Sequence, residues 1–298
     1  MKYEFVVSYV NDILNQYTIK LTLRQIYYKL VAGYGYPNKR SAYNQLSTQL
    51  VKARKRGDTD ETRIEDRSRE FLGGDYHFDS PEEYVTYRFE SFLNSPVYYA
   101  RKMWTSQPEY VMIWVEKDAL SRVISTEADK YNVTTCPSRG YASYTYVKQA
   151  LSTLPEDKQI TVLHFADHDP SGLDMTRDLE NRLSEYSDLP DVTVERIALN
   201  YDQVQHFELP PNPTKRADPR YKRYNAEYGN ECWELDAIEP VELQAMVSEA
   251  IRSHIDSDIW NQTLEETEQE REELRGMFSS IKNLLIEHGY YVSPDSLS

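Results

Sequence analysis

Two continuous apolar runs, each ending in an acid, constrain most strongly what this chain can fold into. They span Tyr110–Glu116 and Ile160–Asp167, and segments with helical spacing follow each of them. Continuous apolar strands that alternate with helices are typical of a parallel sheet covered on both faces. The pattern therefore predicts an α/β domain. Its other predicted helices and strands are 118–131, 133–136, 144–154, 173–186 and 192–199.

Three carboxylates follow the two main strands: Glu116 after the first, and Asp167 and Asp169 after the second. Ligands of parallel sheets bind at the carboxyl ends of the strands. Alternation along an extended backbone predicts that Asp167 and Asp169 point to one side. Carboxylate oxygens are preferred Mg²⁺ ligands, and such a site can support phosphodiester transfer. The alternative, that these acids merely follow strands and enter turns, stays open.

A zinc site is a further interpretation of the same segment, because His164 and His168 have the i, i+4 spacing of a helical zinc motif. However, 161–165 has the pattern of a strand, and Pro170 disfavours helix just before it. We therefore expect His164 to be an ordinary strand residue.

Charge is distributed unevenly along the chain. The net charge of −15 alone argues against nucleic acid, but residues 1–57 hold ten basic and only two acidic side chains. Helical spacing over 22–31, a turn over 33–37 and a basic helix over 40–56 outline a helix-turn-helix unit. A solvated helix face is the alternative. The residues that we expect to contact DNA here are Lys39, Arg40, Lys52, Arg54, Lys55 and Arg56.

Arg24 and Tyr28 are i, i+4 neighbours on the first of these helices. A guanidinium beside a phenol can bind a phosphate and favour the phenolate that a tyrosine nucleophile needs. A tyrosine that packs on an arginine stem is the alternative, and it stays open.

The rest of the sequence sets the class of protein. Residues 58–78 are a candidate wing, Ser80 and Pro81 begin a helix that ends near residue 93, and 94–108 is a boundary. Residues 208–230 are expected to form a loop with a second basic group, and the tail from 240 to 289 is expected to be helical. No apolar run is long enough to span a membrane, and only two cysteines occur, so we expect a cytoplasmic protein. The expected DNA contacts would make it nucleoid-associated.

Five segments, in order along the chain, resemble motifs of the topoisomerase VI A subunit and its relative, the meiotic double-strand-break transesterase. The most similar form is a compact, stand-alone A-like protein. The chain departs from the family's pattern at Ser171, where an aromatic residue or His is usual, and at Arg139–Ser143, where "RGYAS" replaces "GKGYP". The segments are Leu23–Tyr28, Trp114–Ala119, Arg139–Tyr141, Asp167–Gly172 and Trp233–Ile238.

The resemblance implies a winged-helix domain over 1–105, a toprim sheet domain over 106–240 and a helical extension over 241–298. It implies that Tyr28 is the nucleophile that forms a 5′-phosphotyrosyl link and that Arg24 binds the scissile phosphate. Glu116, Asp167 and Asp169 would hold Mg²⁺, and Glu116 would aid proton transfer. Arg139 would contact the DNA.

The resemblance further implies a homodimer on double-stranded DNA, in which the tyrosine of one protomer meets the metal site of the other. No Gly-rich ATP-binding loop occurs in the sequence, so strand passage would need a separate ATPase subunit. Two other functions stay open: a toprim nuclease that hydrolyses DNA with metal-activated water, and a non-catalytic DNA-binding scaffold.

Overall fold

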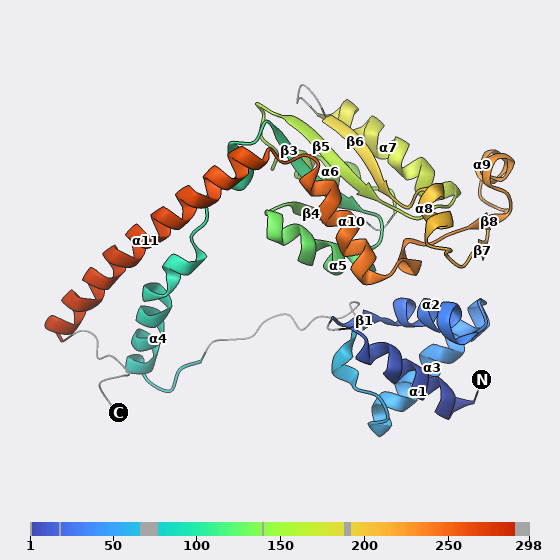
Figure 1. Ribbon diagram of the computed structural model, residues 1–298, viewed down its shortest axis with the longest axis horizontal. Helices are drawn as coiled ribbons and strands as arrows, with labels where there is room; N and C mark the ends of the chain where they lie inside the picture. Colours follow the sequence, from blue (N-terminus) through green and yellow to red (C-terminus); the bar gives the residue numbers. More distant parts are fainter. Residues whose placement is uncertain (1, 18, 66–76, 139, 188–191, 290–298) are drawn as a thin grey trace. The chain divides into compact units, whose positions relative to one another are not determined.

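The computed structural model describes residues 2–17, 19–65, 77–138, 140–187 and 192–289 (Figure 1). The chain divides into two compact units, each made of two separate stretches of sequence. The first unit combines Met1–Glu70 with Glu109–His254, and the second combines Phe71–Pro108 with Ile255–Ser298. The predicted domain limits at residues 105 and 240 differ from these divisions and stay a prediction.

The beginning of the first unit is helical, as predicted. Thr22 starts α2 with a capping box, because its side chain accepts from Gln25 N while the Gln25 side chain accepts from Thr22 N. Gly57 ends α3 in the left-handed conformation that glycine adopts without strain. The elements of this part are α1 (Tyr3–Asn15), β1 (Leu21–Thr22), α2 (Leu23–Tyr34), α3 (Arg40–Arg56), η1 (Glu61–Arg63) and β2 (Ile64–Glu65).

The short strands β1 and β2 pair in parallel, with Leu21 opposite Ile64. Of the candidate wing, residues 66–76 lie outside the described part of the chain. The apolar faces of α1, α2 and α3 pack together around Val10, Ile26 and Leu46, which are almost fully buried. This packing places α2, with Arg24 and Tyr28, on a helical core of its own.

A four-stranded parallel sheet in the order β4-β3-β5-β6 forms the centre of the first unit (Figure 1). This confirms the predicted α/β class. Residues Val111–Val115 of β3 are all buried, as expected of a strand covered on both faces. The strands are β3 (Glu109–Val115), β4 (Thr134–Pro137), β5 (Gln159–Phe165) and β6 (Val192–Ala198).

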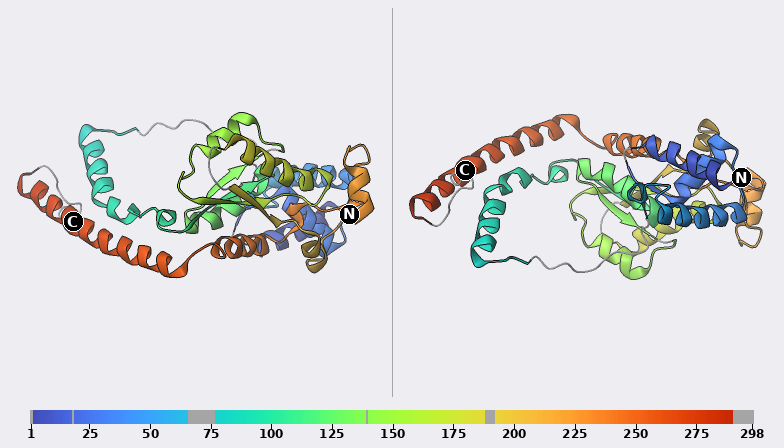
Figure 2. Two further views of the ribbon diagram at one scale, coloured as in Figure 1. Left: turned by 90° about the horizontal axis from the view of Figure 1, so that it is seen from above. Right: turned by 90° about the horizontal axis from the view of Figure 1, so that it is seen from below.

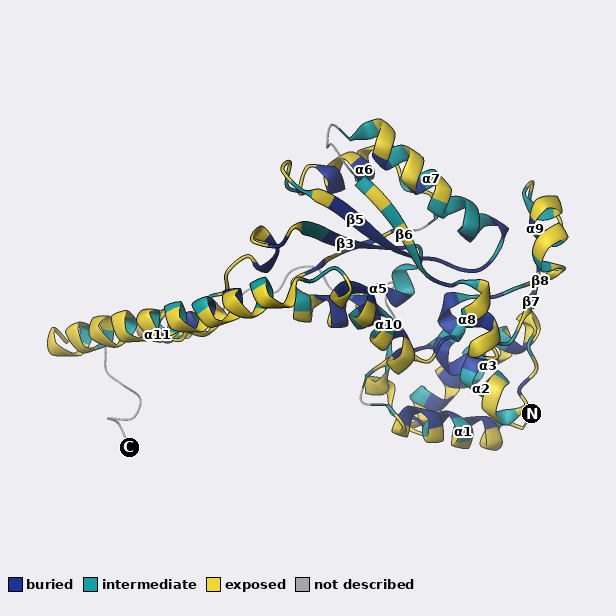
Figure 3. Cartoon of the chain, turned by 45° about the horizontal axis from the view of Figure 1, so that its top comes forward, coloured by how far each residue is buried: buried dark blue, intermediate teal, exposed yellow. Residues whose placement is uncertain are grey.

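Helices cover both faces of this sheet. Figure 3 shows α6 and α7 on one face, where they bury the apolar side of the strands, and α5 with α10 on the other. Val147 of α6 and Leu179 of α7 meet Trp114 and Val162 in this core. The covering helices are α5 (Asp118–Ala128), α6 (Tyr144–Leu151), α7 (Pro170–Tyr186) and α10 (Pro240–Arg252), and a 3₁₀ turn, η4 (Asp129–Tyr131), follows α5.

Residues 208–230 are more ordered than the predicted loop. The expectation was wrong because this segment contains a helix and the first strand of a hairpin. β7 pairs antiparallel with β8, with Asn212 opposite Cys232. The elements around this segment are α8 (Tyr201–His206), β7 (Asn212–Pro213), α9 (Tyr221–Tyr228), β8 (Glu231–Cys232) and η5 (Leu235–Ala237).

The second unit is built on two helices, α4 (Pro81–Leu93) and α11 (Ser257–Glu287), with two 3₁₀ turns, η2 (Ser95–Tyr98) and η3 (Met103–Thr105). Ser80 caps α4 as predicted, and α11 is one uninterrupted helix (Figure 2). Phe92 and Phe278 stack with their ring centroids 4.5 Å apart. No helix of the described residues is long and apolar enough to cross a bilayer.

Candidate functional site

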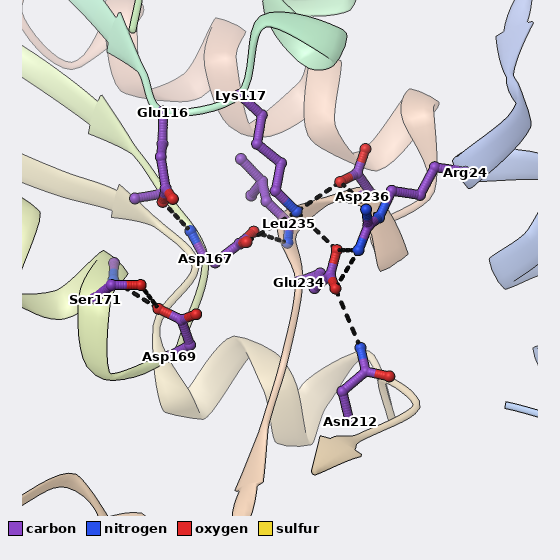
Figure 4. Close-up of polar contacts among 12 residues, drawn as sticks. Arg24, Glu116, Lys117, Asp167, Asp169, Ser171, Asn212, Glu234, Leu235 and Asp236 are labelled. Carbon is purple, nitrogen blue, oxygen red and sulfur yellow. Dashed lines mark hydrogen bonds and ion pairs between the residues drawn. The ribbon is translucent and has the colours of Figure 1, made fainter. Parts of the chain in front are cut away.

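The ends of β3 and β5 place Glu116 and Asp167 side by side. Glu116 N donates to Phe165 O across the two strands at 2.9 Å. The Glu116 carboxylate in turn accepts from Asp167 N at 3.1 Å (Figure 4). The predicted position of both acids at the carboxyl edge of the sheet is therefore confirmed.

Asp169 has a different local role, because α7 starts immediately after it. Its Oδ1 accepts from Gly172 N at 2.6 Å and from Ser171 Oγ at 2.8 Å, so Asp169 is the N-cap of α7. In Figure 4 its carboxylate lies toward Ser171, whereas that of Asp167 lies toward Leu235. β5 ends at Phe165, before both acids, so alternation along a strand does not set the directions of their side chains.

A half-buried lysine lies at the centre of a cluster of acids. Lys117 Nζ is 2.8 Å from Asp167 Oδ2, 2.9 Å from Glu234 Oε2 and 2.7 Å from Asp236 Oδ2. The backbone N–H of Leu235 donates to the other oxygen of Asp167 at 2.8 Å. We call Glu116, Asp167, Asp169, Glu234 and Asp236 the acid centre.

Burial changes the proton affinities in the acid centre. It raises the pKa of Glu116 to about 7, with a further contribution from the charge on Asp167. It also raises the pKa of Asp167 to about 6, although Lys117 acts in the opposite direction. Burial would lower the pKa of Lys117, but the carboxylates of Asp167, Asp236 and Glu234 together hold it well above its usual value.

Helix α2 brings Arg24 and Tyr28 to the acid centre of the same chain. Arg24 forms an ion pair with Glu234, and its Nε lies 3.7 Å from Asp236. Asn212 Nδ2 donates to Tyr28 Oη at 2.8 Å and lies 3.5 Å from Glu234 Oε1. The sequence predicted that Arg24 and Tyr28 share a face, and the structure adds that this face meets residues 212–236.

The Tyr28 side chain is inaccessible in this conformation. The residue is 4% exposed, and burial together with Glu234 raises the pKa of its phenol to about 12. Two neighbouring contacts hold α2 and the turn after it in place: Lys29 of α2 pairs with Glu239, and Asn38 Nδ2 in the turn donates to Pro211 O at 2.7 Å.

Arg196 is a structural residue of the site that the sequence did not reveal. Its guanidinium donates to the carbonyl oxygens of Ala166, Asp167 and Gly172, and to Thr176 Oγ1. It thereby fixes the turn between β5 and α7. Burial lowers its pKa to about 10. No local motif signals it, because Arg196 lies about one strand–helix repeat away from the turn that it holds.

Lys117, Glu234 and Asp236 also lacked a predicted role, although the sequence offered a signal for them. Lys117 directly follows Glu116, and the two acids alternate within Trp233–Ile238, one of the five segments that carry the resemblance. Their meeting depends on the segment after the hairpin β7–β8 folding back on the turn after β5, where His168 pairs with Trp233. Spacing along the chain does not contain that information.

The predicted DNA-contacting side chains of α3 are largely open to solvent. Only Arg54 is partly covered. The Lys52 ammonium lies 4.7 Å above the ring of Tyr3, and the three basic residues of the last turn also favour the helix dipole. Arg139 lies outside the described residues. The exposed members are Lys39, Arg40, Lys52, Lys55 and Arg56.

The structure does not support the zinc interpretation. His164 lies in β5, as expected, and its Nδ1 is 2.9 Å from Thr176 Oγ1. His168 instead contacts Tyr224 Oη through its Nδ1 at 3.0 Å. Burial lowers the pKa of His164 to about 3 and that of His168 to about 4. Within the described part of the chain, no three or more His, Cys, Asp or Glu side chains are grouped as metal ligands.

The chain was compared with models of known protein families and with curated proteins, and neither comparison finds a match. The function is therefore argued from the site itself.

Proposed function

We propose that this chain cleaves double-stranded DNA through a 5′-phosphotyrosyl intermediate, with Mg²⁺ as cofactor, in the manner of a topoisomerase VI A subunit. One observation carries the proposal. Asn212 links the Tyr28 phenol to Glu234, and Glu234 pairs with both Arg24 and Lys117 at the carboxyl edge of a parallel sheet. The parallel sheet and the basic helices before it also fit the toprim and winged-helix domains that the resemblance implies.

The proposed reaction replaces one ester bond with another. The Tyr28 oxygen bonds to the scissile phosphorus and loses its proton to solvent, while the 3′-oxygen of the strand leaves and takes up a proton. Arg24 would stabilise the charge on the phosphate. Glu116 would aid proton transfer to the 3′-oxygen, as the resemblance implies.

The acid centre fits Mg²⁺ by its donor set. Mg²⁺ commonly binds one or two carboxylates and completes its shell with water and substrate phosphate. Among the described contacts, Glu116 Oε1 and Asp169 Oδ2 have no partner, whereas both oxygens of Asp167 are engaged. Glu116 and Asp169 would hold the ion directly, with Asp167 exchanging its contact to Lys117 for the metal. The ion would neutralise charge on the phosphate.

Tyr28 must become exposed before it can react. The contacts of α2 with residues 212–239 would have to open, which would free the phenol for a phosphate or for the acid centre of a second protomer. The resemblance implies the second arrangement, and we propose a homodimer on that ground.

The burial of Tyr28 favours one alternative function. An acid centre that works without the phenol would hydrolyse DNA with a metal-activated water. In that case the contact through Asn212 would be structural, and the products would carry free 5′-phosphate ends.

Incubation of supercoiled DNA with the protein and Mg²⁺, followed by a denaturing gel, tests the proposal. We expect linear DNA with covalently attached protein from the wild type and none from Tyr28→Phe. Tyr27→Phe is the matched control and should retain the adduct, because the hydrogen bonds of the Tyr27 hydroxyl to described residues all go to the Pro37–Lys39 turn. An adduct that persists in Tyr28→Phe would contradict the assignment of the nucleophile.

A further inference from the structure

A pocket between α7 and α9 lies outside the acid centre. It has a volume of about 410 Å³, which is within the range of ligand sites in proteins. We call it the α7–α9 pocket. Its lining combines arginines with tyrosine rings and two acids, and its members are Pro170, Leu173, Asp174, Arg177, Arg220, Arg223, Tyr224, Glu227 and Tyr228.

The arginines of the α7–α9 pocket are oriented by acids but keep free donors. Asp174 accepts from Arg177 Nε and Nη2 and from Arg220 Nε. Asp218 accepts from Arg220 Nη1. Arg177 Nη1, Arg220 Nη2 and the whole Arg223 guanidinium therefore have no partner among the described contacts. Donors held in this way match the oxygens of a phosphate.

The charge around α9 favours an anion although the chain as a whole is acidic. The stretch 214–226 holds five basic residues against one acid, Asp218, in a chain of net charge −15. Two acids of the lining oppose this: Asp174, which is neutralised by its two arginines, and Glu227, which is exposed.

The aromatic wall of the α7–α9 pocket is held rigidly. Tyr224 Oη lies 3.0 Å from the carbonyl oxygens of both His168 and Glu231. The Tyr228 ring packs edge-on against the His168 ring at 4.6 Å and lies 5.1 Å from the Tyr224 ring. Tyrosine rings fixed beside arginines with free donors can form a stacking platform for an unpaired base.

We propose that the α7–α9 pocket binds a nucleoside phosphate, supplied by an unpaired stretch of a DNA strand. The arginines would take the phosphate and the Tyr228 ring would take the base. A base inside a duplex is stacked on its neighbours and cannot reach the ring, so the pocket selects single strands. The pocket adjoins the acid centre, because α7 starts at Pro170 directly after Asp169 and Tyr224 contacts His168. An unpaired strand that leaves the acid centre therefore has a binding site beside it.

Fluorescence anisotropy with a labelled oligothymidine strand tests this inference. The assay contains EDTA, so it needs neither metal nor Tyr28 chemistry, and its failure is distinct from a failure of the proposed cleavage. We expect Arg223→Glu to weaken binding by about tenfold or more, as loss of a phosphate contact predicts. Lys222→Glu is the matched control, since it makes the same charge change next to Arg223 on α9 but outside the lining. Equal weakening of strand binding by both variants would overturn the assignment of the α7–α9 pocket as the binding site.

Two further comparisons identify the ligand. Tyr228→Leu should weaken binding of the single strand and leave binding of a duplex of the same length unchanged. An equal loss of affinity for both would overturn the stacking role of Tyr228. A free deoxynucleoside monophosphate should not displace the labelled strand at equimolar concentration. Displacement of the labelled strand at that concentration would overturn the proposal that a DNA strand supplies the nucleoside phosphate. It would assign the α7–α9 pocket to a free nucleotide.

Discussion

Glu116 contributes to stability in a direction opposite to that of most carboxylates. Its pKa is about 7 in the folded chain against an ordinary value of 4.5, so the folded state binds the proton more tightly than the unfolded state does. The free energy of unfolding therefore falls as the pH rises through this window. Most paired acids, whose pKa is lowered on folding, instead add stability as the pH rises.

Glu116→Gln removes this dependence while Gln can still accept from Asp167 N. We expect the wild type to lose about 2 kcal/mol relative to the variant between about pH 5 and about pH 8. Hydrogen exchange of the β5 amides, measured in a chelating buffer, reports the stability of this unit. A difference between the two proteins that is constant with pH would contradict the raised pKa of Glu116.

At the residue scale, sequence patterns located acids but not their partners. Glu116 and Asp167 were predictable at strand ends, because apolar runs show where strands stop. The position of Lys117 among three carboxylates was not predictable, since two of them lie more than a hundred residues further along the chain. The proton affinities follow from burial, which only the folded structure defines.

At the scale of elements, the close approach of α7 to β5 depends on one glycine. A Cβ added at Gly172 would lie 2.1 Å from Asp167 O, which is backbone and cannot rotate away. The helix can start here only because residue 172 has no side chain. The same turn holds Asp167 and Asp169, so its geometry also sets the acid centre.

Gly172→Ala should therefore destabilise the first unit by about 2 kcal/mol or more and weaken any activity of the acid centre. The urea midpoint measures the effect on stability. Gly33→Ala in α2 is the control, because nothing lies within 4 Å of its added Cβ and alanine favours a helix. Equal midpoints for the two variants would contradict the close approach.

The predicted helices were most accurate where a cap marks their start. Ser80 caps α4 as expected, Thr22 caps α2, and Gly57 ends α3. The start of α7 was predicted at Leu173, because Asp169 was interpreted only as a ligand and not as a cap. α9 was missed, since the polar, proline-rich stretch around it has no apolar stripe and buries only Tyr224.

At the scale of the whole molecule, the two compact units are discontinuous in sequence. α4 and α11 share the second unit, although the whole sheet lies between them in the chain. Ion pairs of Arg101 with Glu266 and Glu270 and packing of Trp104 on Trp260 hold it together. A linear scan for boundaries does not detect such a pairing, because each half resembles a separate tail or linker.

A mixture of two inactive variants tests whether the proposed chemistry occurs between protomers. Tyr28→Phe and Glu116→Gln should each fail to cut DNA alone. In a mixed dimer, the intact tyrosine of one protomer meets the intact acid centre of the other at one of two sites. We therefore expect nicked circles from the mixture and no linear product. A mixed dimer, verified by tagged pull-down, that leaves DNA intact would contradict cleavage between protomers.

In the proposed reaction the Tyr28 oxygen becomes bonded to a DNA 5′ end. Mass spectrometry of the protein, trimmed with nuclease and protease after reaction with DNA and Mg²⁺, measures this bond directly. We predict one modified peptide, with a nucleotide attached through its 5′-phosphate at Tyr28. Cleaved DNA with free 5′-phosphate ends and an unmodified Tyr28 peptide would contradict the account.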